Sequence, residues 1–124
     1  MLLVGLDLVE NARIRNSMKR PRFCRAILGD DEYRLLSERG FPVQSVAASF
    51  CAKEAFGKAL GTGIRGFSLR EVELLRRENG APYLKLSGCA AKLAKERKIR
   101  FSVSVTHTRE YASVIVIGET ENGE

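Results

Sequence analysis

One long helix constrains the fold of this chain more than any other feature of its sequence. The run VQSVAASFCAKEAFGKAL, residues Val43 to Leu60, follows Pro42 and stops at Gly61. Proline suits the first turn of a helix, and glycine is favoured just beyond its end. Small and apolar side chains occupy most of the circumference and leave little of it for solvent. We therefore expect this helix to be the element on which the rest of the domain packs.

Short or alternating apolar segments predict the strands. In FSVSVTH, Phe101, Val103 and Val105 alternate with polar residues, a period of two that indicates a half-buried strand. A turn at 108–110 returns the chain. The predicted strands are Leu2–Val9, ending near Asp7; Leu69–Leu75 and Tyr83–Leu86, joined by a hairpin turn at Glu78-Asn79-Gly80; and the pair Phe101–His107 and Tyr111–Ile117.

Three shorter helices complete the prediction: Asn11–Lys19, Asp30–Arg39 and Gly88–Lys98. The mixture indicates the α+β class, with a small antiparallel sheet packed on the long helix and on the shorter helices. We expect one domain over residues 1–124, with only the polar tail Glu119 to Glu124 fraying.

Composition narrows the class of protein. Hydrophobic residues make up 44% of the chain and charged residues 29%, which is typical of a soluble globular protein. The first apolar run is broken at Asp7 and lacks a basic start, so a strand is favoured over a signal peptide. Three widely spaced cysteines, Cys24, Cys51 and Cys89, suggest neither disulfides nor zinc, and a reducing cytosol fits them best. A net charge of +6 favours an acidic partner, whether nucleic acid, an acidic protein or a phosphorylated ligand.

Charged side chains interrupt the long helix and the first strand. Glu54 and Lys58 lie four residues apart, so an exposed ion pair worth about 0.3 to 0.5 kcal/mol is one interpretation. Lys53, beside them, also lies on a helix with little exposed surface, and charges in such places need partners or a ligand. Asp7 interrupts an apolar strand at its expected end, which suits either a helix-capping or turn residue or a ligand of a bound ion. Two carboxylates and a lysine together would suit Mg²⁺ and phosphate chemistry.

Three motifs in order give the chain a resemblance to a known family. They are GLDLVENARI at Gly5 to Ile14, AKEAFGKALGTGI at Ala52 to Ile64 and VSVTHTREYA at Val103 to Ala112. With these motifs the chain resembles the holo-[acyl-carrier-protein] synthases, the small bacterial class of 4'-phosphopantetheinyl transferases. The middle motif is the most specific, and the resemblance covers almost the whole chain.

The resemblance implies an activity and a set of catalytic residues. Such enzymes transfer the 4'-phosphopantetheine group of coenzyme A to a serine of apo acyl carrier protein, in support of fatty acid biosynthesis, and release adenosine 3',5'-bisphosphate. It further implies a homotrimer in the cytoplasm, with active sites between subunits. Asp7 and Glu54 would be the Mg²⁺ ligands and Lys58 the pyrophosphate contact, so the puzzling charges would share one task. The general base stays open between Glu54 and a metal-bound water.

Further coenzyme contacts follow from the same resemblance. On its own, Gly61-Thr62-Gly63 indicates the end of a helix followed by a turn. The resemblance implies in addition that the backbone of this loop approaches the coenzyme. His107, the only histidine, reads as a turn residue, and the family places it with Thr106 near the 3'-phosphate. The hairpin residues Asn79, Gly80 and Pro82 would lie near the adenine.

A basic segment, Arg13 to Arg25, is the densest positive stretch of the chain. A solvated helix face or a nucleic-acid surface would explain it. The resemblance implies instead that it docks the acidic helix of acyl carrier protein. The residues concerned are Arg13, Met18, Arg20, Arg22 and Phe23.

The chain departs from the family pattern at three positions. Ser49 stands where the family usually has an arginine, so one expected phosphate contact is absent. Arg65, Lys53 or an arginine of a neighbouring subunit are the candidates to replace it. Ala26 and Gly29 stand where Arg and Thr are usual in the carrier-docking region.

Two other functions compete with the enzyme. A basic module binding RNA or DNA would need stacking aromatics, and aromatic residues are only 7% of the chain, mostly at expected core positions. A non-catalytic carrier-binding subunit is the second alternative, because Ser49 removes a ligand contact. We predict the magnesium-dependent transferase, with coenzyme A and carrier protein as partners and without nucleic acid or membrane.

Overall fold

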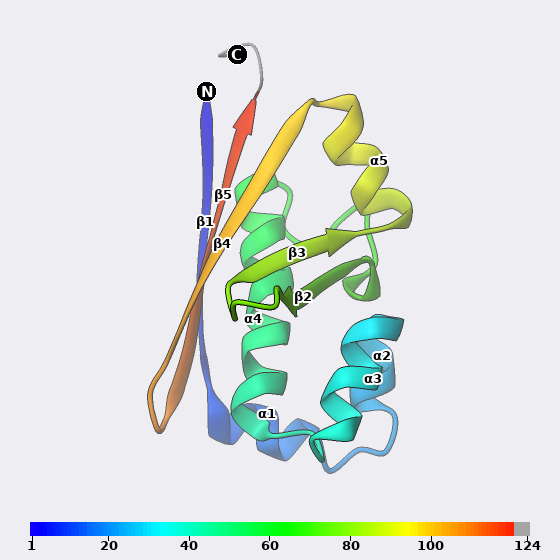
Figure 1. Cartoon of the computed structure of the whole chain (residues 1–124), viewed down its shortest axis with the longest axis vertical. Helices are drawn as coiled ribbons and strands as arrows, with labels where there is room; N and C mark the ends of the chain where they lie inside the picture. Colours follow the sequence, from blue (N-terminus) through cyan, green and yellow to red (C-terminus); the bar gives the residue numbers. More distant parts are fainter. Residues whose placement is uncertain (121–124) are drawn as a thin grey trace.

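The computed structural model describes residues 1–120 and has the expected α+β architecture (Figure 1). Two antiparallel sheets and a series of helices follow one another along the chain. Their order is β1 Leu2–Glu10, α1 Asn11–Ser17, α2 Phe23–Ile27, α3 Asp30–Glu38, α4 Val43–Leu60, the 3-10 turn η1 Leu69–Glu71, β2 Val72–Arg76, β3 Pro82–Leu86, α5 Gly88–Glu96, β4 Ile99–His107 and β5 Tyr111–Thr120.

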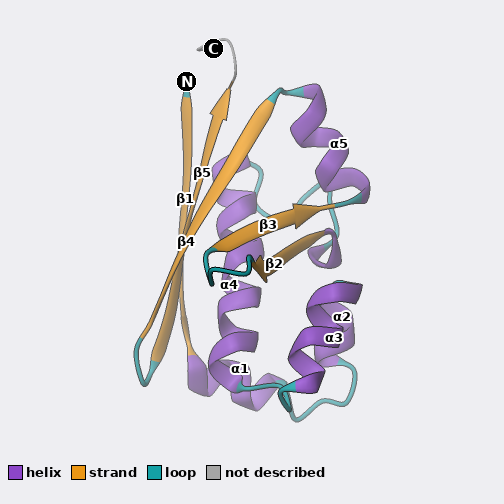
Figure 2. Ribbon diagram, viewed as in Figure 1, coloured by secondary structure: helices purple, strands orange, loops and turns teal. Residues whose placement is uncertain are grey.

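Helix α4 lies between two layers (Figure 2). The three-stranded sheet, in the order β1-β5-β4, covers one side of it. The two-stranded sheet β2-β3 and the α2–α3 segment lie on the other side. Most of its side chains are buried, including Val46, Cys51 and Phe56 at 0% exposure. The prediction that this helix is central, from Val43 to Leu60, is confirmed.

The first strand approaches α4 closely at Gly5. A Cβ atom at that position would lie 1.9 Å from the carbonyl oxygen of Ala55 and 2.5 Å from the amide nitrogen of Ala59. Only glycine lets the two backbones come this near. The contact places Asp7, two residues further along β1, beside the last turns of α4.

Several boundaries differ from the prediction. The 3-10 turn η1 takes Leu69–Glu71, so β2 begins only at Val72. Helix α2 was not predicted, because it is only five residues long, follows Pro21 closely and lacks a capping side chain at its N-terminus. Strand β5 continues to Thr120, so Glu119 and Thr120 are paired with Leu2 and Ile99 and belong to the sheet instead of a tail. The rest of the predicted tail, 121–124, lies outside the described residues.

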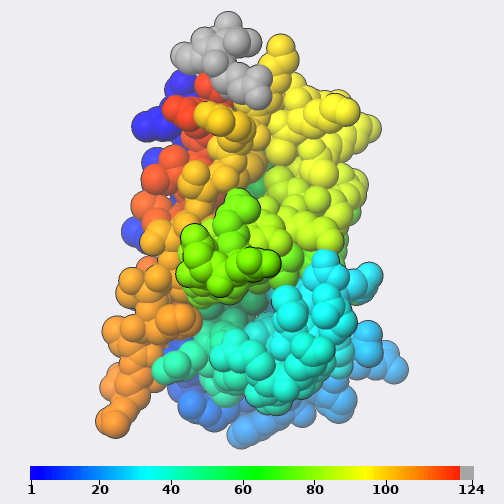
Figure 3. Space-filling view, in the orientation of Figure 1, coloured from blue at the N-terminus to red at the C-terminus, as the bar shows by residue number. Residues whose placement is uncertain are grey.

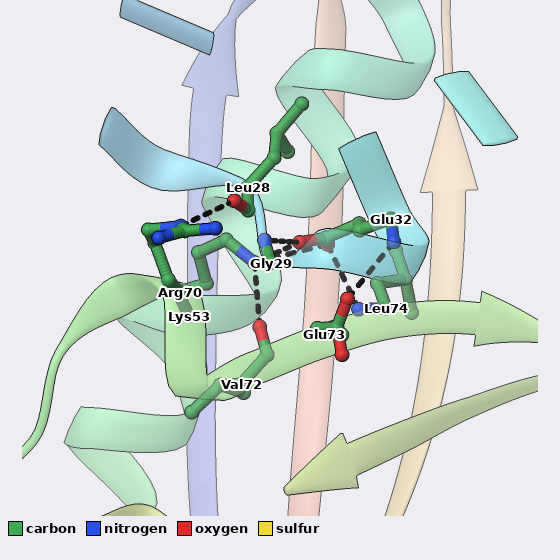
Figure 4. Close-up of polar contacts among 8 residues, drawn as sticks. All are labelled: Leu28, Gly29, Glu32, Lys53, Arg70, Val72, Glu73 and Leu74. Atoms are coloured by element: carbon green, nitrogen blue, oxygen red, sulfur yellow. Dashed lines mark hydrogen bonds and ion pairs between the residues drawn. The ribbon is translucent and has the colours of Figure 1, made fainter. Parts of the chain in front are cut away.

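A buried ion pair joins α3 to α4 (Figure 4). Lys53 is 0% exposed and Glu32 is 1% exposed. The Lys53 ammonium donates to Oε1 and Oε2 of Glu32 at 2.7 and 2.9 Å, and to the carbonyl oxygen of Val72 at 2.5 Å. The Glu32 carboxylate also accepts the backbone N–H groups of Gly29 and Leu74. Every N–H of the ammonium therefore has a partner inside the fold.

The surrounding contacts close this network. The carboxylate of Glu73 accepts the backbone N–H of Glu32 at 2.9 Å, and Arg70 donates to the carbonyl oxygen of Leu28 at 2.9 Å. Burial lowers the pKa of Lys53, and the neighbouring carboxylates of Glu32 and Glu73 oppose that effect. Lys53, which was expected to need either a partner or a ligand, therefore has a structural partner.

The outer face of the three-stranded sheet is apolar along β1. Leu2, Val4, Leu6 and Leu8 point away from α4 and are 57 to 63% exposed. Ile117 of the adjacent strand β5 is also exposed, at 37%. Among the described residues, no helix is long and apolar enough to cross a membrane. Because these exposed side chains form a continuous apolar strip, the surface is unusual for an isolated small domain.

Replacing Lys53 by methionine tests the weight of the buried pair. We expect Lys53→Met to lower the free energy of unfolding by about 3 to 5 kcal/mol, because it leaves the Glu32 carboxylate buried without its cation. Urea denaturation followed by circular dichroism measures the change. Lys95→Met, an exposed lysine on α5, is the matched control and should change stability by less than about 0.5 kcal/mol. Equal stability of both variants would contradict the role assigned to Lys53.

Candidate active site

Asp7 and Lys58 meet where β1 passes the last turn of α4. The Lys58 ammonium donates to Oδ1 of Asp7 at 3.0 Å and to the carbonyl oxygen of Leu6 at 3.1 Å. Ser113 of β5 donates its hydroxyl to the backbone carbonyl of Asp7 at 2.9 Å and so holds this part of the strand. The side chain of Asp7 is 16% exposed and that of Lys58 is 52% exposed. The lysine can therefore turn toward a ligand in solvent.

Glu54 lies one helical turn before Lys58 and faces the same strand. Its side chain is partly buried, and burial raises the pKa of Glu54, with a further rise from the negative charge of Asp7. The positive charges of Arg13 and Lys58 oppose the rise. Two carboxylates that repel one another beside a lysine form a site suited to a hard cation. The structure brings the predicted residues Asp7, Glu54 and Lys58 together.

Cys51 is a neighbour that the sequence analysis missed. It is 0% exposed, and burial, followed by the charge of Asp7, raises the pKa of its thiol to about 12. The thiol therefore stays protonated and is no nucleophile. Its position three residues before Glu54 and seven before Lys58 puts all three on one helix face, and that spacing could have revealed it.

The loop Gly61-Thr62-Gly63 folds back on the end of α4. Gly61 has φ of 81°, the left-handed conformation of a helix C-cap. The backbone N–H groups of Thr62 and Gly63 both donate to the carbonyl oxygen of Gly57, at 3.2 and 3.0 Å. The helix-stop interpretation is thus correct. The same contacts keep the loop within one turn of Lys58.

A second group of predicted residues surrounds a separate cavity of about 340 Å³. His107 lines it at the end of β4, together with Ser49 of α4. Arg76 lines it from β2 and donates to the carbonyl oxygen of Gly80 at 3.4 Å, which ties the hairpin turn to the cavity. In that turn the side chain of Asn79 accepts the N–H of Ala81 at 3.0 Å.

Two other predicted coenzyme residues, Pro82 and Thr106, differ in their position relative to this cavity. Pro82 starts β3 opposite Arg76 and so flanks the same turn. Thr106 alternates with His107 along β4 and is exposed, so its side chain points to the other face of the sheet. The cavity therefore takes His107 but not Thr106.

The two groups of residues lie on opposite faces of α4. Successive helix residues are about 100° apart, so Ser49 is roughly 140° from Glu54 and about 180° from Lys58 around the axis. Asp7 lies on β1 and His107 on β4, and these are the two edge strands of the sheet, with β5 between them. Asp7, Glu54 and Lys58 are not among the residues that line the cavity. Within one chain the structure does not bring all predicted site residues together.

The basic segment adjoins the first group. The Arg13 guanidinium lies 5.6 Å from the ring centre of Phe50, and that of Arg20 lies 5.8 Å from the ring centre of Phe23. The two phenylalanine rings are 6.5 Å apart. Because Phe50 is one turn before Glu54, this basic and aromatic surface reaches the carboxylate centre.

The unusual Gly29 belongs to the buried network and not to this surface. A Cβ atom there would lie 2.4 Å from the side chain of Glu73. The side chain of Glu73 therefore occupies the space that a larger residue at position 29 would need.

Comparison with known proteins gives consistent results. A model of the 4'-phosphopantetheinyl transferase superfamily matches residues 3–116. The holo-[acyl-carrier-protein] synthase of Caldanaerobacter subterraneus subsp. tengcongensis is 38% identical over 118 residues, which cover 94% of this chain and 93% of the relative. That of an Exiguobacterium species is 40% identical over 121 residues, or 95% of this chain and 92% of the relative.

Solved structures show the same fold. The Neisseria meningitidis holo-[acyl-carrier-protein] synthase superposes with a TM-score of 0.88 at 34% identity, over 95% of this chain and 98% of that chain. The Helicobacter pylori synthase, determined in complex with coenzyme A, superposes with a TM-score of 0.81 at 28% identity, over 94% of this chain and 100% of that chain.

Removing one carboxylate tests the cation site directly. We expect Asp7→Asn and Glu54→Gln each to weaken Mn²⁺ binding by about tenfold or more, because affinity follows the number of charged ligands. Electron paramagnetic resonance of Mn²⁺ in the presence of the protein measures the bound fraction. Glu96→Gln, an exposed glutamate of α5, should bind as the wild type does. Unchanged Mn²⁺ affinity in both site variants would rule out the cation site.

Proposed function

The chain belongs to the 4'-phosphopantetheinyl transferase superfamily, among the holo-[acyl-carrier-protein] synthases, and we propose that it acts with two half-sites on opposite faces of α4. It transfers the 4'-phosphopantetheine group from coenzyme A to apo acyl carrier protein, a step that supports fatty acid biosynthesis. The observation that carries the assignment of residues is the meeting of Asp7, Glu54 and Lys58 at one end of α4.

The carboxylate centre fits Mg²⁺. Asp7 and Glu54 would supply two hard oxygen ligands. Within residues 1–120, no group of three or more His, Cys, Asp or Glu side chains is placed to hold a metal ion. Mg²⁺ prefers six oxygen ligands and keeps several from water and substrate phosphates, so two carboxylates suffice. When bound, the ion would neutralise charge on the pyrophosphate of the coenzyme. Burial and, after it, the negative charge of Asp7 raise the pKa of Glu54, and a cation between the two carboxylates would relieve their repulsion.

Lys58 is assigned to the pyrophosphate. Its side chain is 52% exposed and its present partner is the carboxylate that would also take the cation. A cation on Asp7 would free the ammonium for a phosphate oxygen. Transfer of a phosphoryl group is catalysed mainly by positioning and charge neutralisation, and Lys58 provides both. The backbone of Gly61, Thr62 and Gly63 borders the same space.

The nucleotide half of the coenzyme is assigned to the other half-site. His107 lines the cavity, and Asn79, Gly80 and Pro82 belong to the hairpin that borders it. Because this half-site and Lys58 lie on opposite faces of α4, we propose that neighbouring subunits combine them. Thr106, on the outer face of β4, would then be placed for contact across subunits.

We propose a homotrimer, which this arrangement and the exposed strand support. The leucines and valine of β1 present an apolar strip of a kind that protein interfaces cover. We propose that copies of the chain associate through this face of the sheet and complete each other's sites. We also propose that residues 1–124 form a single transferase domain, since the family match spans 3–116.

The carrier protein is assigned to the basic segment beside the carboxylate centre. Arg13, Arg20 and Arg22 supply positive charge, and Met18 and Phe23 supply apolar contact. Such a surface attracts an acidic helix, and the attraction weakens with salt. The free cysteines Cys24, Cys51 and Cys89 support a location in the reducing cytoplasm.

The transfer reaction itself can be observed by intact-protein mass spectrometry. Apo acyl carrier protein incubated with the chain, coenzyme A and Mg²⁺ should gain one phosphopantetheinyl group. Excess chelator should abolish the gain, and added Mg²⁺ should restore it. A carrier with its acceptor serine replaced by alanine is the control and should stay unmodified. Absence of any gain with several carriers, or carrier binding without turnover, would favour the non-catalytic alternative.

A charged residue on the apolar strip tests the trimer. We expect Leu6→Glu to convert a trimer into monomers and to abolish transfer, because a buried, unpaired carboxylate opposes association and the half-sites separate. Light scattering during gel filtration measures the mass. Lys92→Glu, on the exposed face of α5, should leave both mass and transfer unchanged. A fully active wild-type monomer would contradict the shared site.

A further inference from the structure

Helix α1 is short and lacks the usual signals that begin a helix. It has seven residues and no acidic residue in its first turn, and the side chain of its N-cap residue Glu10 makes no capping hydrogen bond. An isolated helix of this length is not stable in water. Contacts with the rest of the fold must therefore hold α1 in place, and with it Arg13.

The turn between β4 and β5 supplies the cap that α1 lacks. The backbone N–H of Asn11, the first residue of α1, donates to the carbonyl oxygen of Glu110 at 2.8 Å. The side-chain amide of Asn11 donates to the carbonyl oxygen of Arg109 at 3.0 Å and to that of Thr108 at 3.5 Å. Three successive carbonyl groups of the turn thus face the first residue of α1.

The turn has its own internal bonds, which do not involve α1. The hydroxyl oxygen of Thr108 accepts the backbone N–H groups of Glu110 and Tyr111 at 3.3 and 3.0 Å. The strands on either side are paired up to His107 and Ala112. Figure 3 shows the tip of this hairpin, in orange, projecting at one end of the molecule. The hairpin is therefore a fixed support on which the start of α1 can be held.

The Asn11 side chain is also the place where the structure leaves a buried polar atom unpaired. Asn11 is 2% exposed, and its oxygen Oδ1 has no hydrogen-bond partner within residues 1–120. A buried amide oxygen without a partner destabilises the folded state, and an apolar side chain would avoid that loss. Stability alone does not explain an asparagine here. What distinguishes it from an apolar residue is the pair of hydrogen bonds from its amide nitrogen to the turn.

Helix α1 leads into the basic surface that we assign to the carrier protein. Arg13 lies two residues after Asn11, and its guanidinium lies 5.6 Å from the ring centre of Phe50 on α4. Arg20 and Arg22 follow on the segment that α1 begins. If α1 frays or rotates, Arg13 moves relative to Phe50 and the spacing of the cations changes. A fixed α1 avoids the entropy cost of ordering this surface when the carrier binds.

We propose that Asn11 is a positioning residue for recognition of acyl carrier protein, because its amide fixes the start of α1 on the β4–β5 turn and so orients Arg13. The inference rests on the proposed function, which assigns the carrier to this surface. Asn11 is buried, so it acts through α1 and not by touching the carrier. Without its amide, only the molecules with α1 in place bind the carrier, and the apparent affinity falls by that fraction.

Transfer assays in which each substrate is varied in turn test the proposal. Asn11→Ala should raise KM for apo carrier about 3- to 10-fold, which corresponds to one lost neutral hydrogen bond. The value of kcat should stay within about twofold, because saturating carrier selects the molecules with α1 in place. KM for coenzyme A should also change by less than about twofold.

A second variant separates the shape of the side chain from its hydrogen bonds. Asn11→Asp keeps the shape but replaces the amide donor by an oxygen, which repels the carbonyl groups of the turn. It should raise KM for the carrier at least as much as Asn11→Ala. The matched control is Ser37→Ala, which removes an exposed side-chain hydrogen bond to the carbonyl oxygen of Arg34 at 2.8 Å on α3. It should behave as the wild type with both substrates.

Hydrogen exchange measured by mass spectrometry observes the position of α1 directly. In Asn11→Ala, a peptide that covers residues 11–20 should exchange faster than in the wild type, because α1 opens more often. Peptides of α4 should exchange at the wild-type rate. The same peptides of Ser37→Ala should be unchanged throughout.

The outcomes distinguish this proposal from the proposed function. Unchanged exchange of α1, or faster exchange with an unchanged KM for the carrier, would overturn the role of Asn11. An equal or larger rise in KM for coenzyme A would show that Asn11 serves the turn and His107 instead, and would also overturn it. Absence of transfer by the wild type, or an unchanged KM for the carrier in Arg13→Ala, would instead contradict the proposed function.

Discussion

The ion pair between Lys53 and Glu32 sets the orientation of α4, and the rest of the structure depends on that orientation. The Lys53 ammonium is bound to α3 through Glu32 and to β2 through the Val72 carbonyl, so α4 cannot rotate about its axis without breaking a buried contact. One face of the helix is thereby committed to the α3 and β2 layer. Glu54 and Lys58, about 100° and about 140° further round the helix axis than Lys53, must then look toward β1.

The sheet imposes the matching constraint from the other side. Gly5 allows β1 to touch the backbone of α4, and the alternation along the strand turns Asp7 toward the helix and Leu6 and Leu8 away from it. A shift of the strand by one residue would reverse both outcomes. The same two-residue period thus places a carboxylate on the face proposed as catalytic and an apolar strip on the outer face.

The sequence predicted the elements better than the site. Periodicity and the flanking Pro42 and Gly61 were enough for α4, because helix ends have local signals. Helix α2 has no such signal, since its last residue, Ile27, is buried in the core and no side chain among the described residues caps its N-terminus. The motifs identified Asp7, Glu54 and Lys58. They gave no partner for Lys53, because only the packing of Glu32, which is distant in sequence, reveals that partner.

The same gap explains why Arg39 was missed as a residue of the cavity. Arg39 read as a helix-end residue, and its position at the cavity depends on how α3 packs against the start of α4. Sequence spacing shows which residues share a face of one element, but a cavity is formed where several elements meet. Residues that three strands or helices contribute jointly are visible only in the assembled fold.

Two lysines of α4, five residues apart, show how exposure decides what a charge can do. Both are paired with a carboxylate at 3.0 Å or less. Lys53 is fully buried, so separating it from Glu32 would leave two uncompensated charges in the core, and the pair is permanent. Lys58 is half exposed, and an exposed pair of this kind contributes at most about 1 kcal/mol. Water or a phosphate can therefore replace Asp7 as its partner, so this pair would not oppose the proposed binding of a cation by Asp7 and of a phosphate by Lys58.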